Sequence, residues 1–464
     1  MKIAFVLSSA PHYFFFDRVV RSLYAMGHEV RVVCRPGFKP DGNKSGRALL
    51  QLLKDEPRAR FDEGIFRSKG ANFAVTIREL ANYANFLRPG HPNPPSSQPW
   101  AHIYIRNRLY ARLEWVIESR LGNLILSFGV VRRLLAWIET QVQPDPEIMQ
   151  WLEDFAPQVL FVSPFIMSSD LEIEYAKAAK KLGIPTVASV LSWDNLVSKG
   201  TYLVKPDWLF VWNQNLMEEA VAIHEFAREK VFMTGAPVYD PWFDLKPSLD
   251  RDAFCAECGL NPRNPFVLFL GSSQTITDLD VEFIKALIAH FGTMDAKIRP
   301  SIVIRPHPYA PFDMTAFESD WVRIYPRQGG RPDMDETRQV YFNTLYHSAA
   351  VLGVNTTGFL DAAIADKPCV TLRDEQMRAG QGAHFNYLIA ADFIEAANDR
   401  SDAFCIIERI VKGNDSKKKK RRDFARRFMR PQGIAIPASE VMAKAILSIG
   451  HGKKPHEWND KSHE

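Results

Sequence analysis

Short apolar runs that end in small polar or basic residues recur along this chain, and they constrain its fold more than any other feature. The first run, Lys2–Leu7, ends at Ser8, and helix-like segments separate the runs that follow. A continuous apolar run is typical of a strand that is buried on both faces. Because such strands alternate with helices here, the sequence predicts an α/β fold built on parallel sheets.

The strand–helix series occurs twice, which predicts two Rossmann-like domains facing a cleft. The first domain is expected at residues 1–238, with a helical insertion near 40–150, and the second at 251–432. Prolines between 236 and 250 mark the linker, and a C-terminal helix and tail fill 433–464. The chain's 464 residues are enough for two domains of this kind.

The composition is that of an ordinary globular protein, with 46% hydrophobic and 24% charged residues. A net charge of +4 does not by itself indicate a nucleic-acid partner, and none is expected. The five cysteines are few and odd in number, which favours a reducing compartment over a disulfide framework. The N-terminal apolar run is too short for a signal peptide, and no window approaches eighteen uninterrupted apolar residues. We therefore expect a cytoplasmic protein, located at the inner face of the cell membrane if a basic segment described below binds lipid.

The stretch from 301 to 372 carries the clearest functional pattern. One apolar run ends in Arg-Pro-His-Pro at 305–308, and another ends in Asn-Thr-Thr-Gly at 355–358, where a helix begins. Ligands of α/β folds bind outside the carboxyl ends of the strands, so both motifs are expected at a ligand site. Arginine and histidine donate hydrogen bonds to phosphate oxygens, and the N-terminus of a helix attracts anions. This edge is predicted to hold the phosphate and base of a nucleotide.

Two further features belong to the same prediction. A Gly-Ser-Ser stop at 271–273 follows the first strand of the second domain, and Asp361 lies where it could accept hydrogen bonds from a ribose. The predicted nucleotide- and donor-binding residues are Gly271, Ser272, Ser273, Arg305, His307, Pro308, Asn355, Thr356, Thr357, Gly358 and Asp361.

Each of these features also has a purely structural interpretation. Arg305 and His307 could be a surface arginine and a capping histidine at a strand-terminating turn. Thr356 and Thr357 could only cap the helix, and Asp361 could be an acid favoured near the helix start. The ligand site is favoured because both motifs end strands of what should be one sheet.

The two-domain organisation resembles the glycosyltransferase-B fold. The Arg-Pro-His-Pro motif and the segment 356–368 resemble those of bacterial surface-polysaccharide transferases. That group includes the capsule Kdo transferases, the bacterial polysialyltransferases and the CDP-glycerol glycerophosphotransferases. The resemblance implies that the donor phosphate is bound by His307 with Pro308 and by Thr356 with Thr357. This chain has Thr-Thr where many relatives have Ser-Ser.

The same resemblance implies that the acceptor binds the first domain and that catalytic groups lie on its strand-end loops. Asp62 and Glu63 precede Gly64, similar to an acidic motif that supplies the general base of polysialyltransferases, although such pairs are also common in surface turns. His12 follows the first strand and is a second candidate base. The residues expected to shape the acceptor cleft are Ser192, Asp194 and Asn195. The predicted catalytic residues are His307, His12, Asp62 and Glu63.

No metal or other cofactor is expected beyond the nucleotide-sugar donor, which is a substrate. Cys255 and Cys258 form a lone C-x-x-C without a second pair or a nearby histidine cluster. The D-x-D pairs at 278–280 and 333–335 do not directly follow an apolar strand. We interpret them as acids in the first turns of helices.

The segment from Lys417 to Arg430 contains nine basic residues and one acid, Asp423. A solvated helix explains this pattern, and so does peripheral contact with anionic inner-leaflet lipids, since Phe424 and Phe428 lie among the charges. The charge would also suit RNA, but no RNA-recognition module accompanies it.

We therefore expect a metal-independent glycosyltransferase that moves a sugar from a CMP-, CDP- or UDP-linked donor to a surface polysaccharide or glycolipid acceptor. His307 and Arg305 would offset charge on the leaving phosphate, and a group of the first domain would deprotonate the acceptor. Three alternatives stay open: a polyol-phosphate transferase of the CDP-glycerol type, a sugar-nucleotide epimerase, and a non-catalytic scaffold that binds nucleotide sugars.

Overall fold

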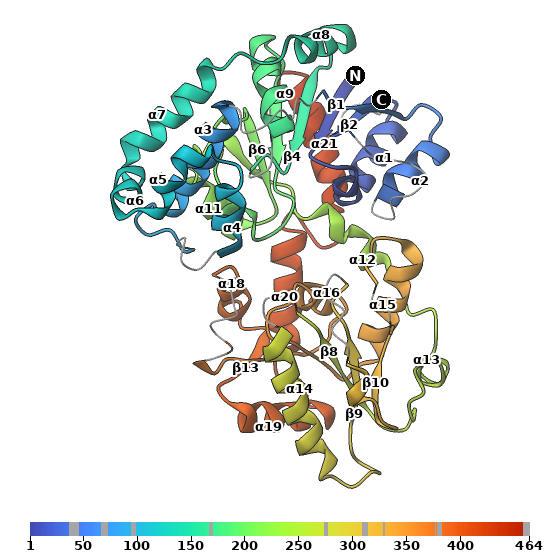
Figure 1. Ribbon diagram of the computed structural model, residues 1–464. Coiled ribbons are helices and arrows are strands. Elements are labelled where there is room, and N and C mark those ends of the chain that lie inside the picture. Colours follow the sequence, from blue (N-terminus) through green and yellow to red (C-terminus); the bar gives the residue numbers. More distant parts are fainter. Residues whose placement is uncertain are drawn as a thin grey trace. The chain divides into compact units, whose positions relative to one another are not determined.

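The computed structural model divides into two compact units (Figure 1). It describes residues 1–36, 46–65, 73–93, 99–166, 170–272, 277–308, 314–327, 330–375, 377 and 383–457. The first unit comprises Met1–Val238 and Phe428–Glu464, and the second comprises Tyr239–Arg427. The chain thus returns to the first unit at residue 428, whereas the predicted division ended the second domain at 432 and set 433–464 apart.

The first unit is built on a seven-stranded parallel sheet with the order β3-β2-β1-β4-β5-β6-β7. Its strands are β1 (Lys2–Leu7), β2 (Glu29–Cys34), β3 (Arg60–Glu63), β4 (Val159–Ser163), β5 (Thr186–Ser189), β6 (Trp208–Val211) and β7 (Val231–Met233). At the end of β1, Leu7 pairs with Cys34 of β2 and with Ser163 of β4. The strand order changes direction beside β1, so the crevice of this sheet lies between the carboxyl ends of β1 and β4.

Residues from the far end of the chain complete the core of the first unit. Phe5 of β1 stacks on Phe161 of β4 with ring centroids 4.4 Å apart, as expected of strands buried on both faces. Helix α21 (Ala438–Gly450) packs on α1 (Asp17–Ala25) and adds Ile446 to the same core. This packing explains why the C-terminal helix belongs to the first unit.

A group of helices, α3 to α7, gathers at one side of the first unit (Figure 1). Besides α1 and α21, the helices of this unit are η1 (Ala10–Phe15), α2 (Arg47–Asp55), α3 (Phe73–Phe86), α4 (Pro99–Arg106), η4 (Ala111–Leu113), α5 (Glu114–Glu118), α6 (Arg120–Ser127), α7 (Gly129–Gln141), α8 (Pro146–Phe155), α9 (Asp170–Lys181), α10 (Asn195–Ser198), α11 (Gln214–Ala222) and η5 (Arg228–Lys230). Strand β3 was not predicted, because its four residues (Arg-Phe-Asp-Glu) are mostly polar and it lies at the edge of the sheet.

A buried network of ion pairs joins this helix group to α9. Arg78 of α3 lies 2.6 Å from Glu139 of α7 and 3.3 Å from Asp170 of α9. Arg108 lies 2.5 Å from the same aspartate. Burial alone would raise the pKa of Asp170, but Arg108 and Arg78 outweigh it and hold that pKa below its usual value. Because these charges are paired, the network fixes α3 and α7 to α9.

The second unit contains a six-stranded parallel sheet with the order β10-β9-β8-β11-β12-β13. Its strands are β8 (Phe266–Leu270), β9 (Ser301–Arg305), β10 (Val322–Ile324), β11 (Ala350–Leu352), β12 (Cys369–Leu372) and β13 (Ile394–Ala397). Its helices are α12 (Asp240–Asp244), α13 (Arg251–Cys258), α14 (Thr277–Gly292), η8 (Thr315–Phe317), α15 (Asp335–His347), α16 (Gly358–Ile364), α18 (Phe385–Ala390), α19 (Arg400–Val411) and α20 (Lys418–Met429), with η6 (Pro237–Tyr239) at the unit boundary. The strand order reverses between β8 and β11, which makes this pair the switch point where doubly wound sheets bind ligands.

Helix α20 carries most of the basic segment that was predicted to be solvated or to contact lipid. Arg421 is fully buried and lies 2.8 Å from Asp366. Phe424 and Phe428 are also buried, and Phe424 stacks on Phe393 with ring centroids 4.1 Å apart. The phenylalanines therefore offer no apolar face to a membrane. The prediction that they support lipid contact at this segment is wrong.

Candidate nucleotide site

The loop after β9 lies against the end of β8. The Gly271 N–H donates to the Arg305 carbonyl at 2.9 Å, directly after the register pair of Leu270 and Arg305. A Cβ atom on Gly271 would lie 3.1 Å from the backbone nitrogen of His307, so the glycine allows these two strand ends to approach closely. His307 is half-buried and Pro308 is exposed at this carboxyl edge.

The loop after β11 lies on the other side of β8. A Cβ atom on Gly353 would lie 3.3 Å from the Leu270 carbonyl oxygen, and one on Gly358 would clash with the Leu270 side chain. Packing against β8 therefore already requires a glycine at 358, whether or not a ligand binds. Because both loops touch the end of β8, the two predicted motifs meet at the switch point.

The two adjacent threonines differ in what their hydroxyl groups do. The Thr356 hydroxyl accepts a hydrogen bond from the Gly358 N–H at 3.1 Å, so it acts as a local cap. Thr357 is exposed and makes no side-chain capping bond, although it is the N-cap residue of the seven-residue helix α16. Asn355 is half-buried beside them. Of this motif, Thr357 is the side chain best placed to meet a ligand.

Arg305 is buried beneath this edge. Its guanidinium lies 4.3 Å from the ring centroid of Tyr341, and its Nη2 donates to the Gly330 carbonyl at 2.9 Å. Burial lowers the pKa of Arg305. Its Nη1 is also buried, with no hydrogen-bond partner among the described residues. The alternative of a surface arginine is therefore wrong, and a buried cationic donor of this kind favours a nearby anion.

Asp361 lies in the first turn of α16 but is buried. Burial raises the pKa of its carboxyl to about 7, while a hydrogen bond with the Tyr341 hydroxyl and the charge of Arg305 partly oppose that shift. Arg305 and Asp361 thus share Tyr341 as a neighbour. The predicted contact between Asp361 and a ribose stays a prediction.

Ser272 is held by Asp280 of α14. The backbone N–H and the hydroxyl of Ser272 donate to the two carboxylate oxygens at 2.5 and 2.9 Å. Burial raises the pKa of Asp280 to about 6, although both bonds from Ser272 lower it. Because both of its hydrogens are already donated to Asp280, Ser272 could contact a sugar nucleotide only by accepting a hydrogen bond at its hydroxyl oxygen. Ser273 lies outside the described residues.

The interpretation of the D-x-D pairs is confirmed for Asp278 and Asp280, which both lie in the first turn of α14. Of the second pair, Asp335 begins α15, whereas Asp333 precedes the helix. In the part of the chain that the structure describes, no group of three or more histidine, cysteine or acidic side chains could hold a metal ion.

Burial sets the charge state of His307 as well. It lowers the pKa of the imidazole below its ordinary value of 6.5, so the ring is neutral at neutral pH. A neutral imidazole can donate one N–H hydrogen bond to a phosphate oxygen, although it brings no positive charge.

In the first unit, His12 lies on η1, directly after β1. Its Nδ1 is 2.7 Å from the Ser8 hydroxyl and 3.3 Å from the Ser9 hydroxyl. The Ser8 N–H donates to the Ser163 carbonyl at the end of β4. His12 therefore stands beside the crevice between β1 and β4, where a catalytic base of this unit would be expected.

Glu172 of α9 was not predicted from the sequence. It lies near the same loop, but neither of its buried carboxylate oxygens has a hydrogen-bond partner among the described residues. It is fully buried, and burial raises its pKa to about 8, while Arg35 and Ser8 lower it. A sequence signal existed, because Glu172 stands between two apolar residues in a helix that follows a buried strand. A carboxyl with such a pKa is an acid–base candidate at neutral pH.

Asp62 and Glu63 lie on the edge strand β3 and not in a surface turn. Asp62 accepts a hydrogen bond from the Trp151 indole at 3.3 Å, and Arg31 lies 3.8 Å away. Since neighbouring strands are about 4.8 Å apart, β3 lies about 10 Å from β1 across β2. The structure does not bring this acidic pair together with His12.

The loop after β5 holds the three residues predicted to shape the acceptor cleft. Asn195 is buried, and its side-chain oxygen accepts from the N–H groups of Leu191 and Ser192 at 2.8 and 2.9 Å. Asp194 accepts from the Ser198 hydroxyl at 2.9 Å. Asn195 and Asp194 therefore fix the shape of the loop, and their contact with an acceptor stays a prediction.

The sequence matches no family model, and no curated protein matches it. Among solved structures, a UDP-GlcNAc 2-epimerase from Neisseria meningitidis bound to UDP-GlcNAc is 14% identical, with a TM-score of 0.54 over 96% of this chain and 100% of that one. A UDP-GlcNAc 2-epimerase from Methanocaldococcus jannaschii is 12% identical, with a TM-score of 0.52 over 95% and 98%. A glycosyltransferase from Rickettsia africae is 10% identical, with a TM-score of 0.53 over 96% and 98%.

The chain has the glycosyltransferase-B fold. The predicted α/β class with two Rossmann-like domains is thereby confirmed. At these identities the similarity concerns the fold alone. Within this glycosyltransferase-B fold, the candidate nucleotide site lies in the second unit, while His12 and Glu172 lie in the first.

Proposed function

We propose that this protein is a glycosyltransferase that uses a nucleotide-activated sugar, with the nucleotide phosphates bound at the carboxyl edge of the second sheet. The observation that carries the proposal is the meeting of the His307 loop and the Thr357 loop on both sides of β8. This is the position at which doubly wound sheets bind nucleotides. The donor is of the CMP, CDP or UDP type, and the acceptor is a surface polysaccharide or glycolipid.

Each side chain at this edge has a specific part in the proposal. Neutral His307 donates one hydrogen bond to the leaving phosphate, and the exposed Thr357 hydroxyl donates another. Arg305 supplies a permanent positive charge from beneath, through an Nη1 that has no partner among the described residues. In the first unit, His12 is the proposed base for the acceptor hydroxyl.

A second candidate is sugar-nucleotide epimerisation. The UDP-GlcNAc 2-epimerases from Neisseria meningitidis and Methanocaldococcus jannaschii align with 95–96% of this chain and with 98–100% of their own length. Epimerisation at C2 must break and remake the C2–H bond, whereas glycosyl transfer leaves that bond intact. Incubation with UDP-GlcNAc in D2O therefore separates the two, since only an epimerase places deuterium at C2.

The proposed function is tested by melting the protein with CMP-, CDP- and UDP-sugars. We expect sugar nucleotides of one class to raise the melting temperature of the protein. The same sugar nucleotides should be consumed when an acceptor is present. Thr357→Val should weaken binding of that sugar nucleotide by about three- to tenfold, the worth of one hydrogen bond, without changing the melting temperature of the free protein. No stabilisation by any nucleotide would contradict the proposal.

A matched pair of variants separates binding from capping. Thr356→Val removes the acceptor of the Gly358 N–H and should cost about 1 kcal/mol of stability. If Thr357→Val and Thr356→Val behave alike, the motif acts only as a helix cap.

A further inference from the structure

Helices α6 and α7 expose an unusually apolar surface. We call the following side chains the α6–α7 face: Leu121, Leu124, Ile125, Phe128, Val130, Leu134 and Trp137. Their exposed fractions run from 42% to 72%. The spacing of three and four residues places them on one side of each helix. Exposed apolar side chains gathered in this way mark an interaction site.

The opposite sides of the same helices are firmly packed. Gly122 and Leu126 of α6 and Leu135 of α7 are buried, and the two leucines join Ala81 and Ala84 of α3 in one hydrophobic cluster. The exposed apolar side chains are therefore not a loosely packed core, because each helix already buries its own face.

Between the flanking acids Glu118 and Glu139, the charges of the α6–α7 segment are all positive. The twenty residues from 119 to 138 contain no aspartate or glutamate, but they contain Arg120, Arg132 and Arg133. An apolar helical face with tryptophan and flanking arginines is typical of helices that lie in the surface of an anionic membrane. Another copy of this chain would not need such a bias in charge.

Length and composition favour lying in the membrane surface over crossing it. Within the described ranges, no single helix is long and apolar enough to span a bilayer. The pair α6 and α7 passes that test only together, with a bend of 77° between them. The 13 residues of α7 extend about 20 Å, less than the roughly 30 Å hydrocarbon core.

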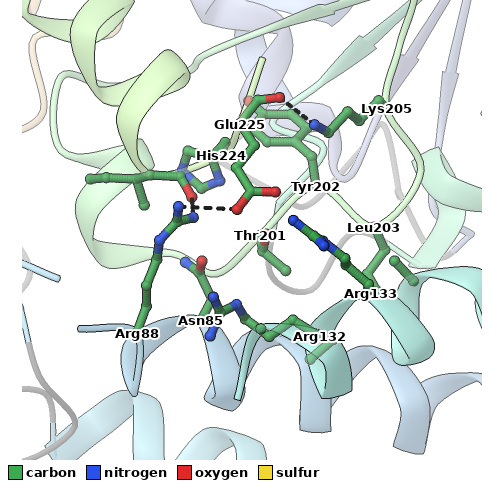
Figure 2. A pocket seen from close by; sticks show the side chains of 14 residues that line it. Asn85, Arg88, Arg132, Arg133, Thr201, Tyr202, Leu203, Lys205, His224 and Glu225 are labelled. Atoms are coloured by element: carbon green, nitrogen blue, oxygen red, sulfur yellow. Dashed lines mark hydrogen bonds and ion pairs between the residues drawn. The ribbon is translucent and has the colours of Figure 1, made fainter. Parts of the chain in front are cut away.

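A cationic cavity of about 250 Å³ opens beside α7 (Figure 2). Its charged lining consists of Arg88, Arg132, Arg133, Lys205 and the single carboxylate Glu225. Arg88 lies 3.0 Å from Glu225, and Lys205 donates to the backbone carbonyl of that residue. Figure 2 shows the guanidinium of Arg133 directed into the cavity, where it has no hydrogen bond or ion pair with the described residues.

The cationic side chains that line the cavity outnumber its one carboxylate. Burial and the charge of nearby Arg88 lower the pKa of both Arg132 and Lys205. The hydroxyl of Tyr202, whose side chain is 5% exposed and lines the cavity, has no hydrogen-bond partner among the described residues. Cationic donors with an unused buried hydroxyl suit a phosphate group.

We propose that the α6–α7 face lies in the surface of an anionic phospholipid bilayer, with its apolar side chains among the acyl chains and a lipid phosphate in the cavity beside α7. Both features occur on one helix, because α7 carries Val130, Leu134 and Trp137 on the face and Arg132 and Arg133 at the cavity. This surface differs from the basic helix α20. Membrane binding by this surface does not depend on the proposed catalytic function.

The test is flotation of the full chain with vesicles of phosphatidylcholine, with and without 30% phosphatidylglycerol. We expect the chain to float with the anionic vesicles. The double variant Leu134→Ser/Trp137→Ser should bind both vesicle types at least tenfold more weakly, because it removes inserted apolar area. Arg133→Gln should reduce only the preference for anionic vesicles. Ile298→Ser, at a 70% exposed apolar residue of the second unit, is the matched control and should bind like the native chain.

Three outcomes would overturn the proposal. One is that Lys418→Glu/Lys419→Glu on α20 abolishes binding while the double variant floats normally. Another is that the chain floats with neither vesicle type but is a dimer by light scattering, and that Leu134→Ser/Trp137→Ser converts it to a monomer. The third is equal binding by the native chain and the double variant. All the substituted side chains of the face are exposed, so unchanged melting temperatures will show that the variants are folded.

Discussion

At the scale of single residues, burial decides what the polar side chains of the second unit can do. Asp361 has a pKa of about 7 because it is buried, and Tyr341 and Arg305 only partly offset that effect. His307 is neutral for the same reason. The sequence placed these residues correctly near a strand end, but it could not show that Arg305 is buried, because an Arg-Pro-His-Pro turn usually faces solvent.

The raised pKa of Asp361 predicts how stability depends on pH. Between about pH 4 and pH 7 the unfolded chain has released the Asp361 proton, while the folded chain still holds it. The folded state then binds more protons, so the free energy of unfolding falls as pH rises, and it levels off above pH 7. We expect a fall of up to about 4 kcal/mol from this group, about 1.4 kcal/mol per pH unit.

Urea unfolding of the native chain and of Asp361→Asn, at half-unit steps from pH 4.5 to 8, measures this contribution. The variant lacks the titrating carboxyl, so its free energy of unfolding should rise relative to that of the native chain as pH rises. A difference between the two proteins that stays constant with pH would show that Asp361 is ionised throughout.

At the scale of elements, the helices α3, α7 and α9 depend on buried ion pairs. Arg78 contacts Glu139, Asp170 and Glu174, and Lys177 lies 3.0 Å from Glu139. Periodicity alone could not reveal this network, because each charge also fits a solvated helix face. The clearest signal is the acid at every second position from 170 to 174, since period two in a helix turns some of those acids inward.

Removing the central arginine should therefore be costly. We expect Arg78→Ala to lower the free energy of unfolding by about 3 kcal/mol, because it removes one cationic partner of the buried carboxylates of Glu139 and Asp170, which then keep Lys177 and Arg108 as partners. Arg106→Ala, which removes an exposed arginine that pairs with Glu114, should lower the free energy of unfolding far less, because exposed ion pairs contribute little to stability. Chemical denaturation of both variants measures the difference. Equal losses would mean that the buried network contributes no more than a surface ion pair.

At the scale of the whole molecule, the strands of both sheets were predictable where they are central. Strands such as β1 and β8 are continuous apolar runs because both of their faces are covered. The edge strands β3 and β13 were missed, since they have four residues each and include charged ones. The return of α21 to the first unit was also missed. A helical pattern shows which face is apolar, but not which domain will cover that face.

The same limit applies to the candidate sites. Strand-end motifs show which residues reach the carboxyl edge, so the meeting of the His307 and Thr357 loops could be expected. Glu172 and the α6–α7 face depend on tertiary packing. In the sequence, the apolar neighbours of Glu172 indicate that it is buried, but they do not show which loop it lies against. The α6–α7 face resembles the buried stripe of an ordinary amphipathic helix, and only the packing of the opposite sides of α6 and α7 shows that it is exposed.

The central claim is that the nucleotide binds at the end of β8 in the second unit. A crystal structure with the sugar nucleotide that gives the largest rise in melting temperature tests it most directly. We predict that the phosphates lie between the ends of β8 and β11, with Thr357 and His307 within about 3 Å of phosphate oxygens. A nucleotide bound in the crevice between β1 and β4 of the first unit, beside His12, would contradict the account.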